Sequence, residues 1–124
     1  MTFLTQTWTP TQADFDLFAS ISGDDNPIHV DPEFSSRTRF GRTVAHGMLL
    51  HARLWAMIRE AHPGRAHLVQ NLMFPAPSYA DEALRIDVAQ REGAPDVLEI
   101  TITRVADGTV TLTGECMLAE GGAP

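Results

Sequence analysis

The segment from Val44 to Ile58 most constrains the fold, because it is apolar over most of the circumference of a helix and consists of good helix formers. Its break lies at His62-Pro63-Gly64. A helix with this pattern is expected to be buried at the centre of a fold. The chain of 124 residues has room for one core, so we expect a single domain over residues 1–124.

Short alternating segments surround this helix in the sequence. We expect strands at 3–8, 68–74, 84–88, 97–102 and 110–113, with Asp107-Gly108 as a hairpin turn between the last two. One strand, a long helix and several antiparallel strands predict an α+β fold, in which one sheet wraps around one helix. The open edges of such a sheet predict pairing into a dimer.

A shorter helix is expected between the first strand and the central helix. Thr11 is suited to cap it, with Asp14 as the partner in a capping box. We expect the helix over residues 11–21, with Gly23 as the glycine that stops it at its C-terminal end. Its expected apolar face consists of Phe15, Leu17, Phe18 and Ile21.

The stretch Ser22–Pro32 follows, and it places the carboxylate of Asp24 five residues before the imidazole of His29. Pro27 fixes its own φ and biases Asn26 toward extended backbone, so we expect a stiff turn rather than a helix, braced by Asn26. Such a turn can hold Asp24 and His29 around one water molecule, as acid–base chemistry requires. A short helical turn is expected over 33–37.

The central helix begins close to His46-Gly47-Met48. Backbone N–H groups near a helix start lack intrahelical acceptors, and glycine lets a ligand approach the backbone closely. We expect His46 to form structural hydrogen bonds at the helix start. Met48, Met57 and Trp55 are expected to fill the core.

With these two motifs, the sequence resembles the MaoC-like family of R-specific 2-enoyl-CoA hydratases. The resemblance lies in residues 18–32 and in residues 44–50, and the element order extends it over nearly the whole chain. It implies a hot-dog fold, with an overhang segment before the central helix, and a homodimer that hydrates trans-2-enoyl-CoA to R-3-hydroxyacyl-CoA. It makes Asp24 and His29 the catalytic pair and the Gly47 N–H an oxyanion donor. Coenzyme A would bind across the dimer interface as part of the substrate, without a separate cofactor.

The remaining candidates for substrate contact are Asn26, His46, Met48 and Ser78. Ser78 departs from the family pattern, in which an apolar residue follows the second proline, and would make the acyl pocket more polar. Asp81 occupies a position where relatives have glycine. Arg53 is bulkier and more polar than expected, which suggests a pairing with an acidic acyl group.

The expected chemistry needs a base for water as its oxygen attacks C3, and a proton for C2. Asp24 is the expected first proton acceptor, although either Asp24 or His29 can serve as base. Two other functions remain open, a hot-dog thioesterase and a non-catalytic dimer module that binds CoA thioesters. Asp24, His29, Asp31 and His46 could bind a metal by residue type, but their spacing does not favour it, and no metal is expected.

Composition narrows the remaining classes. A net charge of −7 disfavours nucleic acid or an anionic membrane as partner. All nine basic residues are arginine. We expect the six in the central quarter of the chain to form either a solvated face or a rim for a phosphate-bearing ligand. These six are Arg37, Arg39, Arg42, Arg53, Arg59 and Arg65. One cysteine, Cys116, excludes an internal disulfide and is expected to be buried. Because neither a membrane-length apolar run nor a signal peptide is visible, we expect a cytoplasmic protein.

Overall fold

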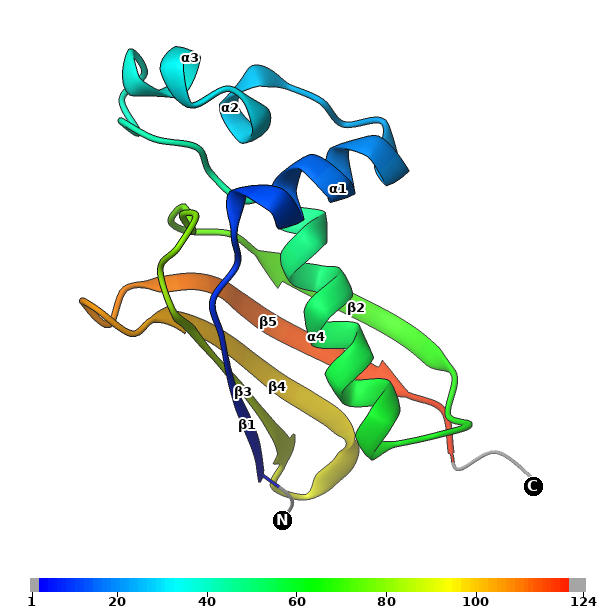
Figure 1. Ribbon diagram of the computed structural model, residues 1–124. Helices are drawn as coiled ribbons and strands as arrows, with labels where there is room; N and C mark the ends of the chain where they lie inside the picture. Colours follow the sequence, from blue (N-terminus) through cyan, green and yellow to red (C-terminus); the bar gives the residue numbers. More distant parts are fainter. Residues whose placement is uncertain (1–2, 121–124) are drawn as a thin grey trace.

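A five-stranded antiparallel sheet and one long helix form the body of the molecule (Figure 1). The computed structural model describes residues 3–120. The strand order is β1-β3-β4-β5-β2, so β1 and β2 form the two edges. The strands are β1 (Phe3–Trp8), β2 (His67–Met73), β3 (Leu84–Arg91), β4 (Ala94–Arg104) and β5 (Val110–Leu118). The helices are α1 (Gln12–Ser22), α2 (Pro27–Val30), α3 (Pro32–Ser36) and α4 (Gly47–Ala61).

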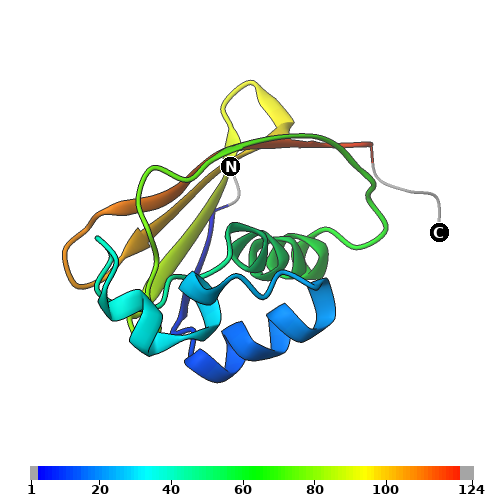
Figure 2. The same cartoon turned by 90° about the horizontal axis from the view of Figure 1, so that it is seen from above.

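The helix α4 lies against one face of the sheet, and the sheet curves around it when viewed from above (Figure 2). Its side chains Leu50, Leu54 and Ile58 are buried against β3, β4 and β5, whose inward side chains alternate along each strand. The core contains Ile86, Val88, Leu98, Ile100, Ile102 and Leu112 among others. This arrangement confirms the predicted α+β fold with a sheet around a central helix.

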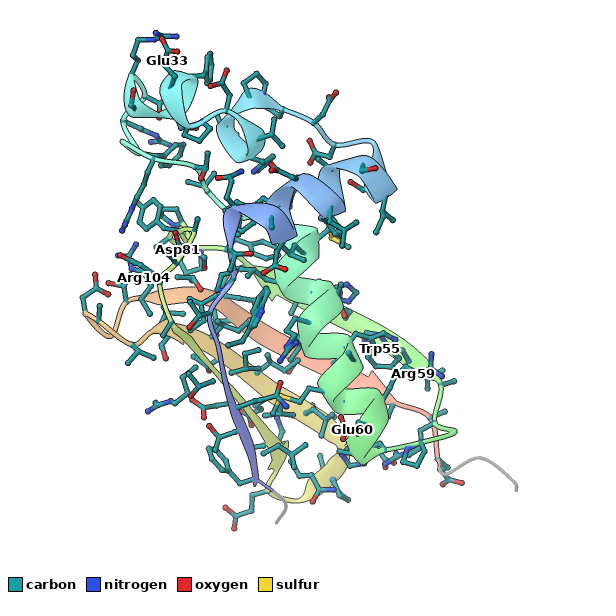
Figure 3. All side chains as sticks on the ribbon, in the orientation of Figure 1. Glu33, Trp55, Arg59, Glu60, Asp81 and Arg104 are labelled. Carbon is teal, nitrogen blue, oxygen red and sulfur yellow. The ribbon has the colours of Figure 1, made fainter. Side chains whose placement is uncertain are left out.

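The prediction that α4 is buried around most of its circumference is wrong. Only one stripe meets the sheet, and the opposite side, with Ala52, Arg53, Ala56, Arg59 and Glu60, is exposed. Figure 3 shows Arg59 and Glu60 on α4 together with Trp55. The alanines raised the apparent apolarity of this side, although their small side chains contribute little to burial. The helix begins at Gly47 and not at Val44 as expected, because Val44 forms an antiparallel bridge with Tyr79.

The helix α1 shows the predicted capping box. The Asp14 N–H donates to Thr11 Oγ1 over 3.2 Å, and the Thr11 N–H donates to Asp14 Oδ2 over 2.8 Å. Gly23 follows the helix with a φ of +81°, as a C-terminal glycine does. Phe15 is buried, but Leu17 and Ile21 are exposed, which corrects the predicted apolar face. The apolar spacing therefore identified the helix but overestimated how much of it is covered.

The segment around Pro27 is helical, contrary to the expected non-helical turn. Residues Pro27–Val30 form the single turn α2, because proline at the first position of a helix needs no N–H acceptor. Asn26 braces this turn as predicted, since its Oδ1 accepts from the Ile28 N–H over 3.2 Å. The helix α3 then begins at Pro32, close to the predicted short helix. Figure 1 shows α2 and α3 beyond α1, above the start of α4.

The loops between strands agree in part with the sequence. The Asp107-Gly108 turn is present, and Gly108 has a φ of +71°. The hairpin between β3 and β4 turns at Glu92-Gly93, where no turn was predicted, and both strands are longer than expected. In the loop before β3, Asp81 has a φ of +66°, a value that glycine adopts more easily. Figure 3 marks Asp81 near Arg104, at the same end of the sheet.

Two further properties follow from the packing. Cys116 is buried in the core, and burial raises the pKa of its thiol to about 11. Within residues 3–120, no helix has the length and apolarity to cross a bilayer.

Candidate active site

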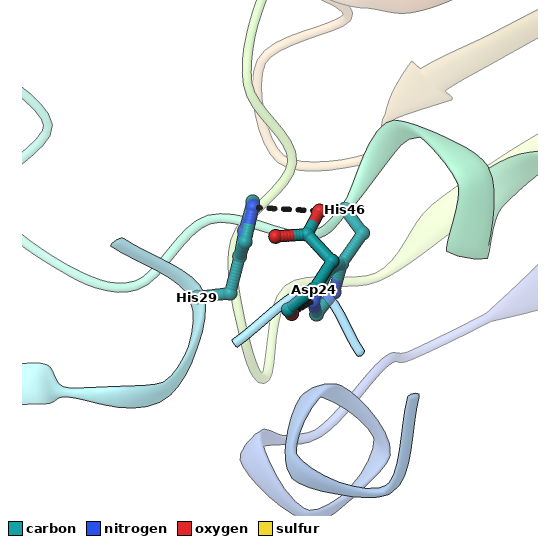
Figure 4. A group of neighbouring side chains, drawn as sticks. All are labelled: Asp24, His29 and His46. Carbon is teal, nitrogen blue, oxygen red and sulfur yellow. Dashed lines mark hydrogen bonds and ion pairs between the residues drawn. The ribbon is translucent and has the colours of Figure 1, made fainter. Parts of the chain in front are cut away.

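Asp24 and His29 face each other, as the sequence predicted (Figure 4). Asp24 Oδ2 lies 3.9 Å from His29 Nε2. The Asp24 side chain is 55% exposed, whereas that of His29 is 11% exposed. The separation exceeds a direct hydrogen bond, so the two atoms can instead share a small molecule between them.

The orientation of His29 is fixed by the backbone. His29 Nδ1 lies 2.7 Å from the carbonyl oxygen of Val44, and because that oxygen can only accept, Nδ1 carries the hydrogen. In the neutral imidazole, Nε2 then has the lone pair and faces Asp24. A second bond, from the Val44 N–H to the Ile28 carbonyl, fixes α2 to the segment before α4. Sequence reasoning missed Val44, because a backbone acceptor leaves no signal in residue type.

His46 supports both members of the pair. His46 Nε2 donates to the backbone carbonyl of Asp24 over 2.9 Å, which confirms the expected structural hydrogen bond. Its ring stacks on that of His29, with centroids 3.9 Å apart, and Phe18 packs nearby at 4.9 Å. Burial lowers the pKa of His46 below its ordinary value, against the hydrogen bond to Asp24, which raises it. A neutral His46 can donate through Nε2 to Asp24.

These three side chains also have the residue types of a metal site. One potential ligand atom from each of Asp24, His29 and His46 lies within 4.8 Å of the others. The fourth residue considered from the sequence, Asp31, is used elsewhere, because its Oδ1 accepts from the Phe34 N–H and caps α3. The ring planes of His29 and His46 are within 23° of parallel. His29 Nδ1 and His46 Nε2 already bond backbone carbonyls, which leaves one nitrogen of each ring for an ion.

Gly47 is the first residue of α4, where backbone N–H groups have no intrahelical acceptor. A Cβ at Gly47 would lie 3.1 Å from the ring of Phe74, which is closer than about nine in ten of the contacts that Cβ atoms make in proteins. Glycine therefore allows Phe74 to pack directly on the backbone at the helix start. The space that a side chain would take at Gly47 is occupied by Phe74, and the approach of a ligand to this backbone stays a prediction.

A cavity of about 400 Å³ opens beside the start of α4. Gly47 and Ser78 line it, together with Arg39, Phe40, Val44, Ala45, Leu50, Phe74, Pro75, Ala76, Pro77 and Thr111. Asp24 and His29 do not line this cavity, but Val44 connects the two regions, since its carbonyl holds His29. Met48 does not line it either and is exposed, so its predicted place in the core is wrong. The cavity has the size of a small-molecule site.

The six central arginines do not act as one group. Arg37 pairs with Glu33, Arg42 with Glu82 and Arg65 with Asp96, and Arg59 is exposed. Arg39 is the one that lines the cavity.

Arg53 lies over the ring of Trp8, in a separate groove that also contains Leu17 and Ile21. This groove shares no lining residue with the cavity at Gly47. Phe18 lines the same groove and packs on His46, so the pairing of Arg53 with an acidic acyl group stays a prediction.

Comparison with known proteins identifies the family of this chain. The family model described as "MaoC like domain" matches residues 1–112. The chain belongs to the MaoC-like family. An (R)-specific enoyl-CoA hydratase from Aeromonas caviae is 32% identical over 111 residues, covering 86% of this chain and 83% of the relative. A 3-hydroxybutyryl-CoA dehydratase from Methylorubrum extorquens is 32% identical over 105 residues, covering 82% and 67%.

Solved structures of MaoC-like proteins agree with the fold. An R-hydratase from Pseudomonas aeruginosa superposes with a TM-score of 0.88 at 28% identity, covering 98% of this chain and 81% of the other. The R-hydratase from A. caviae superposes with a TM-score of 0.84 at 28% identity, covering 99% and 95%. The predicted hot-dog fold is confirmed. These relatives are hydro-lyases, which bears out the predicted enzyme class and supports a general hydratase or dehydratase function for this MaoC-like chain.

Proposed function

We propose that this MaoC-like protein adds water to the double bond of a trans-2-enoyl-CoA to give an R-3-hydroxyacyl-CoA, and catalyses the reverse dehydration. The observation that carries the proposal is the pair Asp24 Oδ2 and His29 Nε2, 3.9 Å apart. A carboxylate and a neutral imidazole with its lone pair facing outward are both acceptors. One water molecule can donate a hydrogen to each, and its oxygen then presents a lone pair to the substrate.

We assign the base to His29 rather than to Asp24, the first acceptor expected from sequence. An imidazole is ordinarily a stronger base than a carboxylate, and the imidazolium that forms would be stabilised by Asp24 beside it. His29 Nε2 takes one proton as the water oxygen bonds to C3, and the same proton then passes to C2. Asp24 holds the other hydrogen throughout. Because one water supplies both groups, they add to the same face of the alkene.

Negative charge collects on the thioester oxygen while C3 is attacked. The Gly47 N–H at the start of α4 is suited to stabilise it, because a donor aimed at the developing enolate binds the transition state more strongly than the substrate. The mixed cavity lined by Gly47 and Ser78 is the proposed site for the thioester. Asn26 and His46 then act by holding the catalytic pair. Met48 is exposed and does not line the cavity, so it has no role in this mechanism.

The deciding experiment is incubation with crotonyl-CoA. Loss of alkene absorbance without release of free thiol, and a single R enantiomer in the product, would support the hydratase. Release of free thiol would identify the alternative thioesterase, whose base has to drive attack at the carbonyl. Binding of the thioester without either change would identify a non-catalytic module.

We also propose that the reaction needs no metal ion, because water is activated by Asp24 and His29 alone. Dialysis against a chelator should leave the rate of hydration unchanged, with metal content followed by mass spectrometry. A rate that falls on chelation and returns with one divalent cation would contradict this mechanism and turn attention to the group Asp24, His29 and His46.

A further inference from the structure

The hydroxyl group of Ser78 is the most conspicuous unused donor in the cavity. Ser78 is 2% exposed, and its Oγ has no hydrogen-bond partner among the described residues. A buried hydroxyl without a partner is unfavourable, so a bound acceptor would be stabilising. The other hydroxyl in the wall, that of Thr111, is directed to the carbonyl of Ile102 at 3.5 Å. Ser78 is therefore free to bond a molecule in the cavity.

The backbone places Ser78 beside the start of α4. The carbonyl of Ser78 accepts from the Ala45 N–H over 2.8 Å, and the neighbouring residues Val44 and Tyr79 form an antiparallel bridge. Ala45 precedes Gly47 by two residues, so their Cα atoms are at most about 7 Å apart. An oxygen that accepts from two donors at about 3 Å each can span about 6 Å between them. The wall of this cavity therefore offers a ligand oxygen two donors, the Gly47 N–H and the Ser78 hydroxyl.

The surroundings favour an oxygen that gains negative charge. The helix α4 has 15 residues and presents its unsatisfied N–H groups and positive dipole end at Gly47. The wall contains the guanidinium of Arg39 and no carboxylate. The remaining lining is mainly apolar, which strengthens hydrogen bonds to a charged acceptor.

We propose that the Ser78 hydroxyl is a second donor to the thioester oxygen and acts with the Gly47 N–H during hydration. The proposal rests on the hydratase function above. As the water oxygen bonds to C3, the electron pair of the double bond moves toward the thioester oxygen, and it returns when C2 is protonated. Ser78 keeps its own proton and forms no covalent bond. Both hydrogen bonds strengthen as the charge develops, so Ser78 lowers the barrier more than it tightens binding.

The size of the effect follows from the shared role. Removing one side-chain donor of an oxyanion hole typically costs up to about 10²–10³ in kcat. Gly47 remains in place, so Ser78→Ala should lower kcat for crotonyl-CoA by about 10- to 100-fold and change KM little. Ser36→Ala is the matched control, because that hydroxyl is exposed, donates to the Glu33 carbonyl and does not line the cavity. It should hydrate crotonyl-CoA at the wild-type rate.

A spectroscopic measurement separates donation from a structural role. Butyryl-CoA labelled with ¹³C at the carbonyl cannot be hydrated, and its C=O stretching frequency falls when the oxygen accepts hydrogen bonds. Binding to the wild-type protein should lower this frequency, and Ser78→Ala should reverse part of the change. Ser36→Ala should leave it at the wild-type value. Ser78→Cys, a weaker donor of similar size, should lie between wild type and Ser78→Ala and serves if the alanine variant does not fold.

An unchanged stretch together with an unchanged kcat in Ser78→Ala would overturn the proposal. A loss limited to enoyl-CoAs with a polar acyl substituent would also overturn it, and would assign Ser78 to the acyl chain instead. Failure of the proposed function is a different result, because the wild-type protein would then not hydrate crotonyl-CoA at all. The frequency measurement needs no turnover, so the difference between wild type and Ser78→Ala reports donation by Ser78 even in the absence of hydration.

Discussion

At the scale of single residues, the site depends on a histidine whose two nitrogens have separate tasks. His29 Nδ1 donates to the Val44 carbonyl, and Nε2 faces Asp24, where we propose that it accepts the proton of water. Neither an amide at position 24 nor one at position 29 can replace the lost base or anionic acceptor. The fold around them should persist, since Asp24 is largely exposed and His46 bonds only its backbone.

We therefore expect Asp24→Asn and His29→Gln each to lower kcat for crotonyl-CoA by about 10³-fold or more. Circular dichroism and thermal unfolding should remain close to those of the wild type. The control is Asp25→Asn, which removes the adjacent exposed carboxylate outside the pair. If either site variant retained activity near that of Asp25→Asn, the assignment of the pair would be wrong.

The proximity of Asp24 and His29 was predictable from the sequence, because they are close along the chain and the segment around Pro27 brings them together. The groups that orient them were not, since the Val44 carbonyl and the His46 ring reach the pair through tertiary contacts. Even the local prediction was incomplete. Pro27 predicts a non-helical turn, whereas proline at the first position of a helix is compatible with helical structure.

At the scale of elements, the edge strand β2 depends on a close approach to β5. Gly114 is opposite Leu72, and a Cβ on it would lie 2.0 Å from the carbonyl oxygen of Asn71. No side chain fits there without separation of the two strands. The strand β2 leads into Phe74, which packs on Gly47, so a shift of this edge would reach the cavity.

Gly114→Ala should lower the free energy of unfolding by about 3 kcal/mol or more, measured by urea denaturation. Thr113→Ala, on the same strand, should cost no more than about 1 kcal/mol, because it removes strand preference without a clash. Equal stability of the two variants would show that β2 can move away from β5 at little cost.

The alternating patterns predicted where strands lie but not how far they extend. Residues 89–96 lack clear alternation, yet pairing across the Glu92-Gly93 turn extends β3 and β4. Hydrogen bonds to a neighbouring strand supply what side-chain preference does not. Burial was also misjudged, because Leu17 and Ile21 are apolar but no element within residues 3–120 covers them.

At the scale of the whole molecule, buried His46 and half-buried His62 and His67 connect stability to pH. Burial lowers the pKa values of His46, His62 and His67, with smaller contributions from nearby charges. In the unfolded chain these groups titrate near 6.5. Between the lowered pKa values of the folded state and pH 6.5, the unfolded state binds more protons than the folded state. The contribution of these histidines to the free energy of unfolding is therefore fully present above pH 6.5 and is lost as the pH drops below it.

We expect the midpoint of urea unfolding to be lower at pH 5.5 than at pH 7.5. His67→Gln should reduce this difference, because it removes one of the three groups and leaves Asp24 and His29 untouched. A midpoint that stays constant, or rises, between pH 7.5 and 5.5 would contradict this account.

The free edge of β2 and exposed apolar side chains beside it fit the dimer expected from the sequence. Met73 is 67% exposed at the end of this strand, next to Phe74. We predict a mass of twice 13.6 kDa by light scattering, shifted toward the monomer by Met73→Glu. Val105→Glu, at a position 57% exposed beyond β4, is the control and should leave the mass unchanged. A wild-type monomer, or equal behaviour of both variants, would contradict a dimer through β2.

The deep burial of Cys116 has a practical consequence for following such association. The chain contains this one cysteine, and a thiol with a pKa of about 11 is almost entirely unionised at neutral pH. Maleimide reagents should therefore spare the native chain. A cysteine introduced at exposed Met48 would then receive a fluorophore or spin label alone, and distances between labels on two copies could be measured without replacing any native residue of the core.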